Sequence, residues 1–335
     1  MDLQFARRHL VSLIESGADP ATVLADARAL LEELDQDAGL YSDIGAYASD
    51  NGESELAAEY FETALDLEPD NPLHHYDLGV ALLRRGRPAE ARRSLEQAIA
   101  LLPYYTDALV NLAVAYLDID EPLAAFAAAN RVLDLYGDQP LPQNVEGLGA
   151  TVGHWLRSPD LDEPRTLKAA LEAVGEGALE EARELLAVLA SGLEPGTASR
   201  AVCEEYAATV AFHLDRHSDY LAGLGQRREI VPCAQAFMPV LAIDVAEAGR
   251  MRDVDRLCHL LVAEIDPQHV PRGPVMKMQT NAARGSGSAT YSVSSGDDGF
   301  YEITPVGNMA DVVAPGGDRY RLYDYSGAYA AFHAP

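Results

Sequence analysis

His213 and His217 have the spacing that comes closest to a metal site. They lie four positions apart in HLDRH, so a helix would turn two imidazole nitrogens to one side. The sequence offers no third ligand nearby. Cys258 and His259 are adjacent, so on a helix their side chains point apart. We therefore predict neither a metal site nor a cofactor.

Motifs of common enzyme classes are missing from the sequence. It contains no phosphate-binding loop, no GxSxG nucleophile elbow and no HExxH zinc motif. Cys203–Glu204 has no histidine at a recognisable spacing. Asp297 and Asp298 stand in GDDG, but an EF-hand needs alternating acids and a closing glutamate. We expect a protein without enzymatic activity; the alternative is an enzyme site within residues 140–267 or in the C-terminal segment.

A spacing of 34 residues organises the first part of the chain. Pairs of glycines, alanines and prolines recur at this distance: Gly45 and Gly79, Gly52 and Gly86, Ala57 and Ala91, Ala64 and Ala98, Pro69 and Pro103. The clearest unit, residues 72–105, predicts two helices. Gly86 ends the first helix, Pro88 begins the second, and Pro103 turns the chain into the next unit. Gly79 and Ala91 are small where the two helices should approach closely.

This pattern resembles the tetratricopeptide repeat (TPR) family. Residues 38–71 match as well, residues 106–139 match more loosely, and residues 4–37 form a degenerate first unit. The resemblance implies an all-α fold, in which stacked helix pairs form an α-solenoid with a right-handed superhelix and a concave groove that binds other chains. We therefore predict a solenoid of four units over residues 1–139.

The resemblance also implies a binding site, because the first helix of each unit lines the groove. The positions that would face it are Ser42, Asp43, Ala46, Tyr76, Asp77, Val80, Val110, Asn111 and Val114. Asp43, Asp77 and Asn111 are 34 apart, so the solenoid would stack them as a polar ladder. The TPR subgroup that grips C-terminal carboxylates uses lysine, arginine and asparagine here, and only Asn111 matches. The two aspartates favour a protein or peptide bearing arginine or lysine, unless they merely cap local N–H groups or solvate the helix.

The rest of the chain divides into two further parts. Residues 140–267 read as a divergent, TPR-like helical region, with a partial repeat at 163–196, a helical pattern at 197–230 and a helix pair at 232–267 turned at Gly249 and closed by Pro267. Residues 268–335 form a Gly/Ser/Tyr-rich C-terminal segment. Its alternating stretches ATYSVSS, GFYEIT and RYRLYDYSG predict short strands. We expect either a small irregular or β-rich appendage or an extended tail.

The charge of the chain restricts its partners. The formal net charge is -28, and residues 1–70 hold 17 acids against three arginines. Repulsion would keep nucleic acid and anionic membranes away, although acidity also serves solubility or adaptation to high salt. No apolar run is long enough to span a bilayer, and the N-terminus has no signal-peptide pattern, so we expect a cytoplasmic protein. The three cysteines are expected to be buried reduced thiols.

Two binding functions remain open from the sequence, beside the enzyme alternative. The first is a non-enzymatic scaffold or adaptor that binds a basic protein or peptide in the acidic groove. The alternative is a self-regulated adaptor or a modification substrate, whose Tyr-rich C-terminal tail docks in the groove or is acted on by a partner enzyme. In that case Arg284, Arg319 and Arg321 of the tail would meet Asp43 and Asp77.

Overall fold

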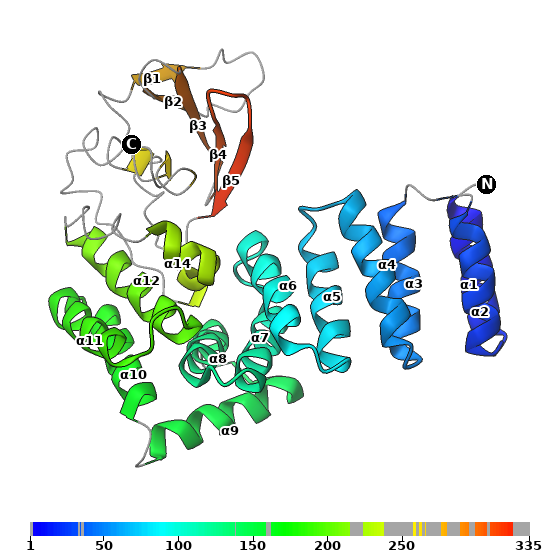
Figure 1. The fold of residues 1–335 in the computed structure, drawn as a ribbon, viewed down its shortest axis with the longest axis horizontal. Helices are drawn as coiled ribbons and strands as arrows, with labels where there is room; N and C mark the ends of the chain where they lie inside the picture. The colour runs from blue at the N-terminus through cyan, green and yellow to red at the C-terminus, as the bar shows by residue number, and fades with distance from the viewer. Residues whose placement is uncertain are drawn as a thin grey trace. The chain divides into compact units, whose positions relative to one another are not determined.

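The structure is a computed structural model of residues 1–335 (Figure 1). It describes residues 3–32, 34, 37–137, 139–158, 162–214, 224–237, 257–258, 261–262, 265, 276–279, 289–294, 299–306 and 309–323. By contacts the chain divides into two compact units, Met1–Ala128 and Ala129–Pro335. The division falls inside helix α8 (Pro122–Tyr136). The three-part division at residues 139 and 267 stays a prediction.

The first unit is a row of helices (Figure 1), and the contacts between successive helices run unbroken from residue 3 to residue 118. They are α1 (Leu3–Glu15), α2 (Pro20–Leu31), α3 (Ala38–Asp50), α4 (Ser54–Leu67), α5 (Pro72–Arg84), α6 (Pro88–Leu101), α7 (Thr106–Asp118) and the start of α8. Helices α3, α5 and α7, the first of each pair, also contact one another in turn. The predicted solenoid of stacked helix pairs is confirmed.

Small residues allow the two helices of a pair to approach closely. A Cβ atom at Gly79 of α5 would lie 2.6 Å from Cγ of Leu95 in α6, and one at Gly45 of α3 would lie 2.8 Å from Cε1 of Phe61 in α4. Ala91 is fully buried beside this contact. The close approach predicted at Gly79 and Ala91 is therefore present.

The turns between paired helices also repeat every 34 residues. Gly52 and Gly86 follow the ends of α3 and α5 and have positive φ angles of 85° and 68°. This backbone conformation ends a helix and suits glycine. The third turn has Asp120, with φ 61°, at the repeat position where the first two turns have glycine. At the other ends, Pro72 and Pro88 begin α5 and α6, where a missing backbone N–H is harmless.

The second unit continues with helices and ends in a sheet. After the end of α8, the helices whose bounds are described in this unit are α9 (Gln143–Arg157), α10 (Asp162–Gly175), α11 (Leu179–Gly192), α12 (Ala198–His213) and α14 (Leu224–Ile230). In the partial repeat at 163–196, Gly177 has φ 76° between α10 and α11, and Ala182 and Leu186 are fully buried. Most of the helix pair predicted at 232–267, including Gly249 and Pro267, lies outside the described residues. Within that range, Ala234–Phe237 forms a 3-10 helix, η1.

An antiparallel sheet forms the C-terminal appendage in the order β1-β2-β3-β4-β5. The strands are β1 (Met276–Gln279), β2 (Ala289–Ser294), β3 (Phe300–Val306), β4 (Met309–Val313) and β5 (Arg319–Tyr323). Ile303 of β3 pairs with Tyr291 of β2 and Val312 of β4, and all three side chains are buried. Alternation correctly predicted β2, β3 and β5. The segments of β1 and β4 were not predicted as strands.

Candidate functional site

The nine predicted groove positions lie on α3, α5 and α7, and each is exposed or half-buried. We call their common surface the first-helix face. It consists of Ser42, Asp43 and Ala46 of α3, Tyr76, Asp77 and Val80 of α5, and Val110, Asn111 and Val114 of α7. The buried faces of the same helices carry core residues such as Ile44, Leu78 and Leu112.

Polar contacts connect neighbouring helices along the first-helix face. Arg7 Nε of α1 lies 3.0 Å from Asp43 Oδ2 of α3 in an ion pair. The Ser42 hydroxyl of α3 donates a 3.3 Å hydrogen bond to Asp77 Oδ2 of α5. Asn111 of α7 donates from Nδ2 to the Asp107 carbonyl in its own helix at 2.9 Å. The aspartates thus contact side chains of adjacent helices.

Asp77 is half-buried, and its surroundings act on its charge in two directions. Burial raises the pKa of its carboxyl, because the ionised form loses hydration. The hydrogen bond from Ser42 and the charge of His74 lower the pKa in part. Water solvates the Asp77 carboxylate incompletely. A cation close to Asp77 would therefore offset the hydration that the carboxylate loses through burial.

A tyrosine pair lies beside Asp77. The ring centroids of Tyr76 and Tyr105 are 4.8 Å apart, with their planes tilted by 42°. Burial raises the pKa of both phenols, and the negative charges of Asp77 and Asp107 raise it further. A hydrogen bond with the Asn111 side chain acts on Tyr76 in the opposite direction. This region combines aromatic rings with nearby carboxylates.

Tyr76 is among the positions that the sequence predicts for this face, whereas Tyr105 is not. Tyr105 lies in the turn just before α7, outside the helix positions that the repeat assigns to the groove. The sequence does offer one signal for Tyr105. It directly follows Tyr104 in LLPYY, and two adjacent aromatic residues are unusual in a short solvated turn between helices. Arg7 was missed because it belongs to the degenerate first unit.

An apolar recess adjoins the first-helix face at its N-terminal end. It measures about 280 Å³ and lies between α1, α2 and α3. Asp43 and its partner Arg7 both contribute to the lining, together with apolar side chains that include Val11, Ile14 and Ile44.

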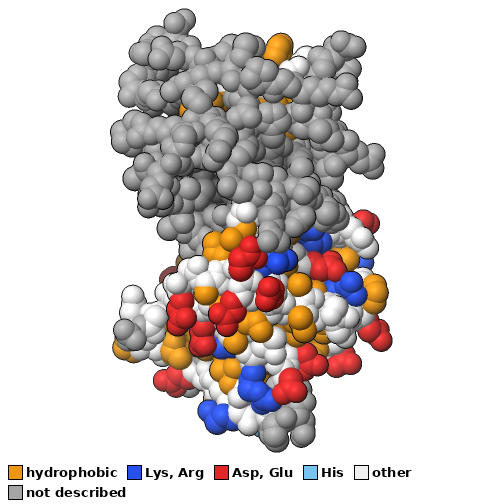
Figure 2. All heavy atoms as spheres, turned by 90° about the vertical axis from the view of Figure 1, so that its left-hand side faces the viewer, with side chains coloured by type: hydrophobic (Ala, Val, Ile, Leu, Met, Phe, Trp, Pro, Cys, Tyr) orange, Lys and Arg blue, Asp and Glu red, His pale blue; other side chains and the backbone are white. Residues whose placement is uncertain are grey.

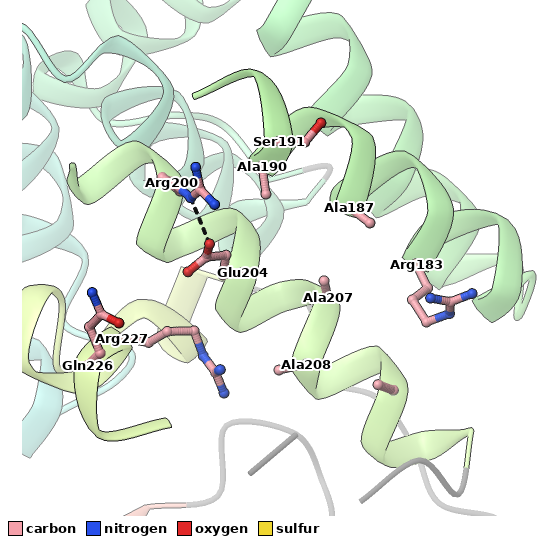
Figure 3. Close-up of a pocket in the computed structure, with 11 residues that line it drawn as sticks. Arg183, Ala187, Ala190, Ser191, Arg200, Glu204, Ala207, Ala208, Gln226 and Arg227 are labelled. Atoms are coloured by element: carbon pink, nitrogen blue, oxygen red, sulfur yellow. Dashed lines mark hydrogen bonds and ion pairs between the residues drawn. The ribbon is translucent and has the colours of Figure 1, made fainter. Parts of the chain in front are cut away.

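A second recess of about 480 Å³ lies in the second unit between α11, α12 and α14 (Figure 3). Alanines, including Ala187, Ala190 and Ala207, line it together with arginines. Each arginine has a glutamate partner: Arg183 contacts Glu180 at 3.1 Å, Arg200 contacts Glu204 at 2.7 Å, and Arg227 contacts Glu205 at 2.8 Å. Figure 2 shows one face of the molecule, on which acidic side chains lie among basic and apolar ones over the coloured part.

The residues considered for metal binding and catalysis are not assembled into a site in the described part of the chain. His213 ends α12, whereas His217, His259, Asp297 and Asp298 lie outside the described residues. Within the described ranges, no group of three His, Cys, Asp or Glu side chains is placed to hold a metal ion. Cys203, Cys233 and Cys258 are buried and form no disulfide, as predicted. No helix among the described residues is long and apolar enough to cross a membrane.

One family model agrees with the helix-pair architecture. The family model described as "Tetratricopeptide repeat" matches residues 42–106 and 81–140. No curated protein matches the chain. One similar solved structure is the Sgt2 TPR domain from Aspergillus fumigatus, which is 20% identical over 37% of this chain and 83% of that chain, with a TM-score of 0.33.

Two further solved structures are similar over more of the chain. PilF of Pseudomonas aeruginosa is 17% identical, covering 70% of this chain and 94% of its own, with a TM-score of 0.35. A tetratricopeptide repeat protein from Parabacteroides merdae is 12% identical, covering 79% and 88%, with a TM-score of 0.40. The family match, the 34-residue spacing and the stacked helix pairs agree: residues 42–140 of this chain are tetratricopeptide repeats.

Proposed function

We propose that this chain is a non-enzymatic scaffold or adaptor that binds a protein or peptide on the first-helix face, through arginine or lysine side chains of the partner. The observation that carries the proposal is the contact between Tyr76 and Tyr105 beside Asp77. A cation against an aromatic ring is attracted by the ring, and the neighbouring carboxylates of Asp77 and Asp107 add to this attraction.

The rest of the first-helix face suits the other parts of such a partner. Val80 and Val110 are half-buried and Val114 is exposed. These valines offer apolar contacts for the methylene stem of an arginine or lysine, whose charged head can then reach a carboxylate. Asn111 and Ser42 supply polar groups for the partner backbone.

The charge of the whole chain supports the same class of partner. A net charge of -28 attracts basic segments over a long range and repels nucleic acids and anionic lipids. This field accelerates association with a basic peptide, and salt screens it. Location in the cytoplasm stays a prediction from the sequence.

The alternative function, a tail that docks in the groove or is modified, has less support. Tyr291 and Tyr301 are buried in the sheet, where a modifying enzyme would not reach their hydroxyl groups, whereas Tyr320 is 39% exposed. Arg321 already pairs with Asp311 of the adjacent strand through hydrogen bonds of 2.7 Å and 3.2 Å. The described part of the segment is thus a sheet with its own contacts.

The test uses fluorescent dodecapeptides of glycine and serine that contain two arginines, and isosteric peptides in which citrulline replaces both. We expect the arginine peptides to bind more tightly. Asp77→Asn and Tyr76→Leu should each weaken binding by about fivefold, since each removes roughly 1 kcal/mol of attraction. Fluorescence anisotropy measures the affinities.

Glu59→Gln is the matched control for charge. Glu59 is exposed on α4, the second helix of its pair, and the substitution removes one negative charge just as Asp77→Asn does. If Asp77→Asn weakens binding no more than Glu59→Gln, the first-helix face is not the binding site. Equal binding of arginine and citrulline peptides would contradict the proposed basic partner.

A further inference from the structure

The recess between α1, α2 and α3 has an apolar interior that opens to solvent. Leu10 and Ile44 are buried in its floor. Val11 and Ile14 form a wall and are 51% and 43% exposed. These two side chains are three positions apart on α1, so they present one continuous apolar surface.

The size of the recess suits a single side chain. Pockets that enclose drug-sized ligands measure roughly 300–1,000 Å³, and this recess, at about 280 Å³, lies just below that range. A leucine, methionine or phenylalanine side chain projecting from a longer peptide could fill it and cover Val11 and Ile14. Removing these apolar surfaces from water would favour binding.

The rim of the recess indicates which residue accompanies that side chain. Asp43 belongs both to the lining and to the first-helix face, where it pairs with Arg7. The side chains of Arg7 and Asp43 are 45% and 60% exposed, so their ion pair is weak and exchanges readily. A cation from a partner can therefore replace Arg7 at Asp43. The acidic surplus of residues 1–70 favours such a cation.

We propose that the recess is an anchor pocket for one large apolar side chain of the partner, and that an arginine or lysine close to it in the partner sequence engages Asp43. This inference rests on the proposed function and deepens it. A basic residue alone would bind at Tyr76 and Asp77. The anchor adds selection for an apolar residue at a definite distance from the basic one.

The experiment uses the full chain and the same dodecapeptides, with one position occupied by leucine or serine. That position is moved from one to four residues away from an arginine. We expect the best leucine peptide to bind at least about tenfold more tightly than its serine counterpart, because a buried leucine side chain contributes well over one decade in affinity. Val11→Ser should reduce this ratio to below about threefold.

Val188→Ser is the matched control. Val188 is 69% exposed on α11 of the second unit, so the same substitution is made away from the recess. Val188→Ser should bind the leucine peptide more tightly than the serine peptide by the same factor as the unsubstituted protein does. Both positions are exposed, so we expect both variants to fold, and far-ultraviolet circular dichroism checks this.

The outcomes separate the anchor from the proposed function. If binding depends on arginine but the leucine-to-serine ratio is near one, the anchor is wrong and the function stands. If the leucine peptides bind more tightly than the serine peptides, but arginine and citrulline peptides bind equally, the preference for a basic partner is wrong in both proposals. If light scattering shows a dimer that Val11→Ser dissociates, a second copy of the chain occupies the recess, which also overturns the inference.

Discussion

The hydroxyl of Tyr116 in α7 donates a 2.7 Å hydrogen bond to Oε1 of Glu96 in α6, and both side chains are buried. Arg92, one turn before Glu96, lies 3.6 Å from the same carboxyl oxygen. Burial nevertheless outweighs these contacts and raises the pKa of Glu96 to about 7, while Arg92, Tyr116 and Arg93 act in the opposite direction. Two successive repeats therefore meet at a carboxyl group that changes charge near neutral pH.

This carboxyl group should make the stability of the protein depend on pH. The folded-state pKa of Glu96 is higher than its unfolded value, so the folded state binds the proton more tightly. Protonation of Glu96 therefore contributes to the free energy of unfolding. This contribution is fully present below pH 4.5 and is lost as the pH rises through about 7. The loss amounts to about 3 kcal/mol. Glu96→Gln keeps an acceptor for Tyr116 and should remove this dependence.

Urea unfolding at pH 5, 6, 7 and 8 measures the effect. The difference in unfolding free energy between Glu96→Gln and the unsubstituted protein should grow with pH. Glu62→Gln, at an exposed position of α4, is the control and should shift stability equally at every pH. A constant difference for Glu96→Gln would show that the Glu96 carboxyl does not titrate in this range.

Close packing at Gly79 predicts a destabilising substitution. In Gly79→Ala the new Cβ would lie 2.6 Å from Cγ of Leu95, which is fully buried and has little room to move. We expect a loss of about 1–3 kcal/mol, although alanine is otherwise the better helix former. Gly147→Ala is the control, because nothing lies within 4 Å of its Cβ position in α9. Thermal unfolding should show that Gly147→Ala is neutral or stabilising by up to about 1 kcal/mol.

The repeated turns predict a reciprocal pair of substitutions. Gly86 and Asp120 occupy the same repeat position with φ angles of 68° and 61°. Asp120→Gly should stabilise the protein by about 1 kcal/mol, because glycine adopts this conformation without strain. Gly86→Asp should destabilise it by a similar amount, since the space around Gly86 is open and only the backbone conformation opposes a side chain. Effects of the same sign in chemical denaturation would contradict this explanation.

The ion pair between Arg227 of α14 and Glu205 of α12 predicts a large effect in the second unit. Both side chains are buried, with Nε and Oε2 2.8 Å apart. Arg227→Met should destabilise this unit by about 3–5 kcal/mol, because the Glu205 charge loses its arginine. Arg183→Met removes a more exposed arginine paired with Glu180 and should change stability by less than about 1 kcal/mol. Fluorescence of Trp155, the only tryptophan, reports the unfolding of this unit.

Local pattern was sufficient to predict the elements of the repeat region. Gly86 and Pro88 mark a helix end and a helix start because their backbone preferences depend little on distant residues. Alternation in ATYSVSS and GFYEIT predicted β2 and β3 because successive side chains of a strand face opposite sides. The segments MKMQ (β1) and MADVV (β4) are too short to show a clear alternation. Only their pairing with the adjacent strands β2 and β3 identifies them as strands.

The sequence by itself determined the repeat, its helix pairs and the helix positions that form the first-helix face. Periodic small and apolar residues encode these features locally, and stacking similar units leaves little choice of arrangement. Only the tertiary structure showed that Tyr105 meets Tyr76, that Arg7 reaches Asp43 and that α1, α2 and α3 leave an apolar recess. The two pairs are 29 and 36 positions apart in the sequence. Such contacts follow from the packing of whole helices rather than from any local pattern.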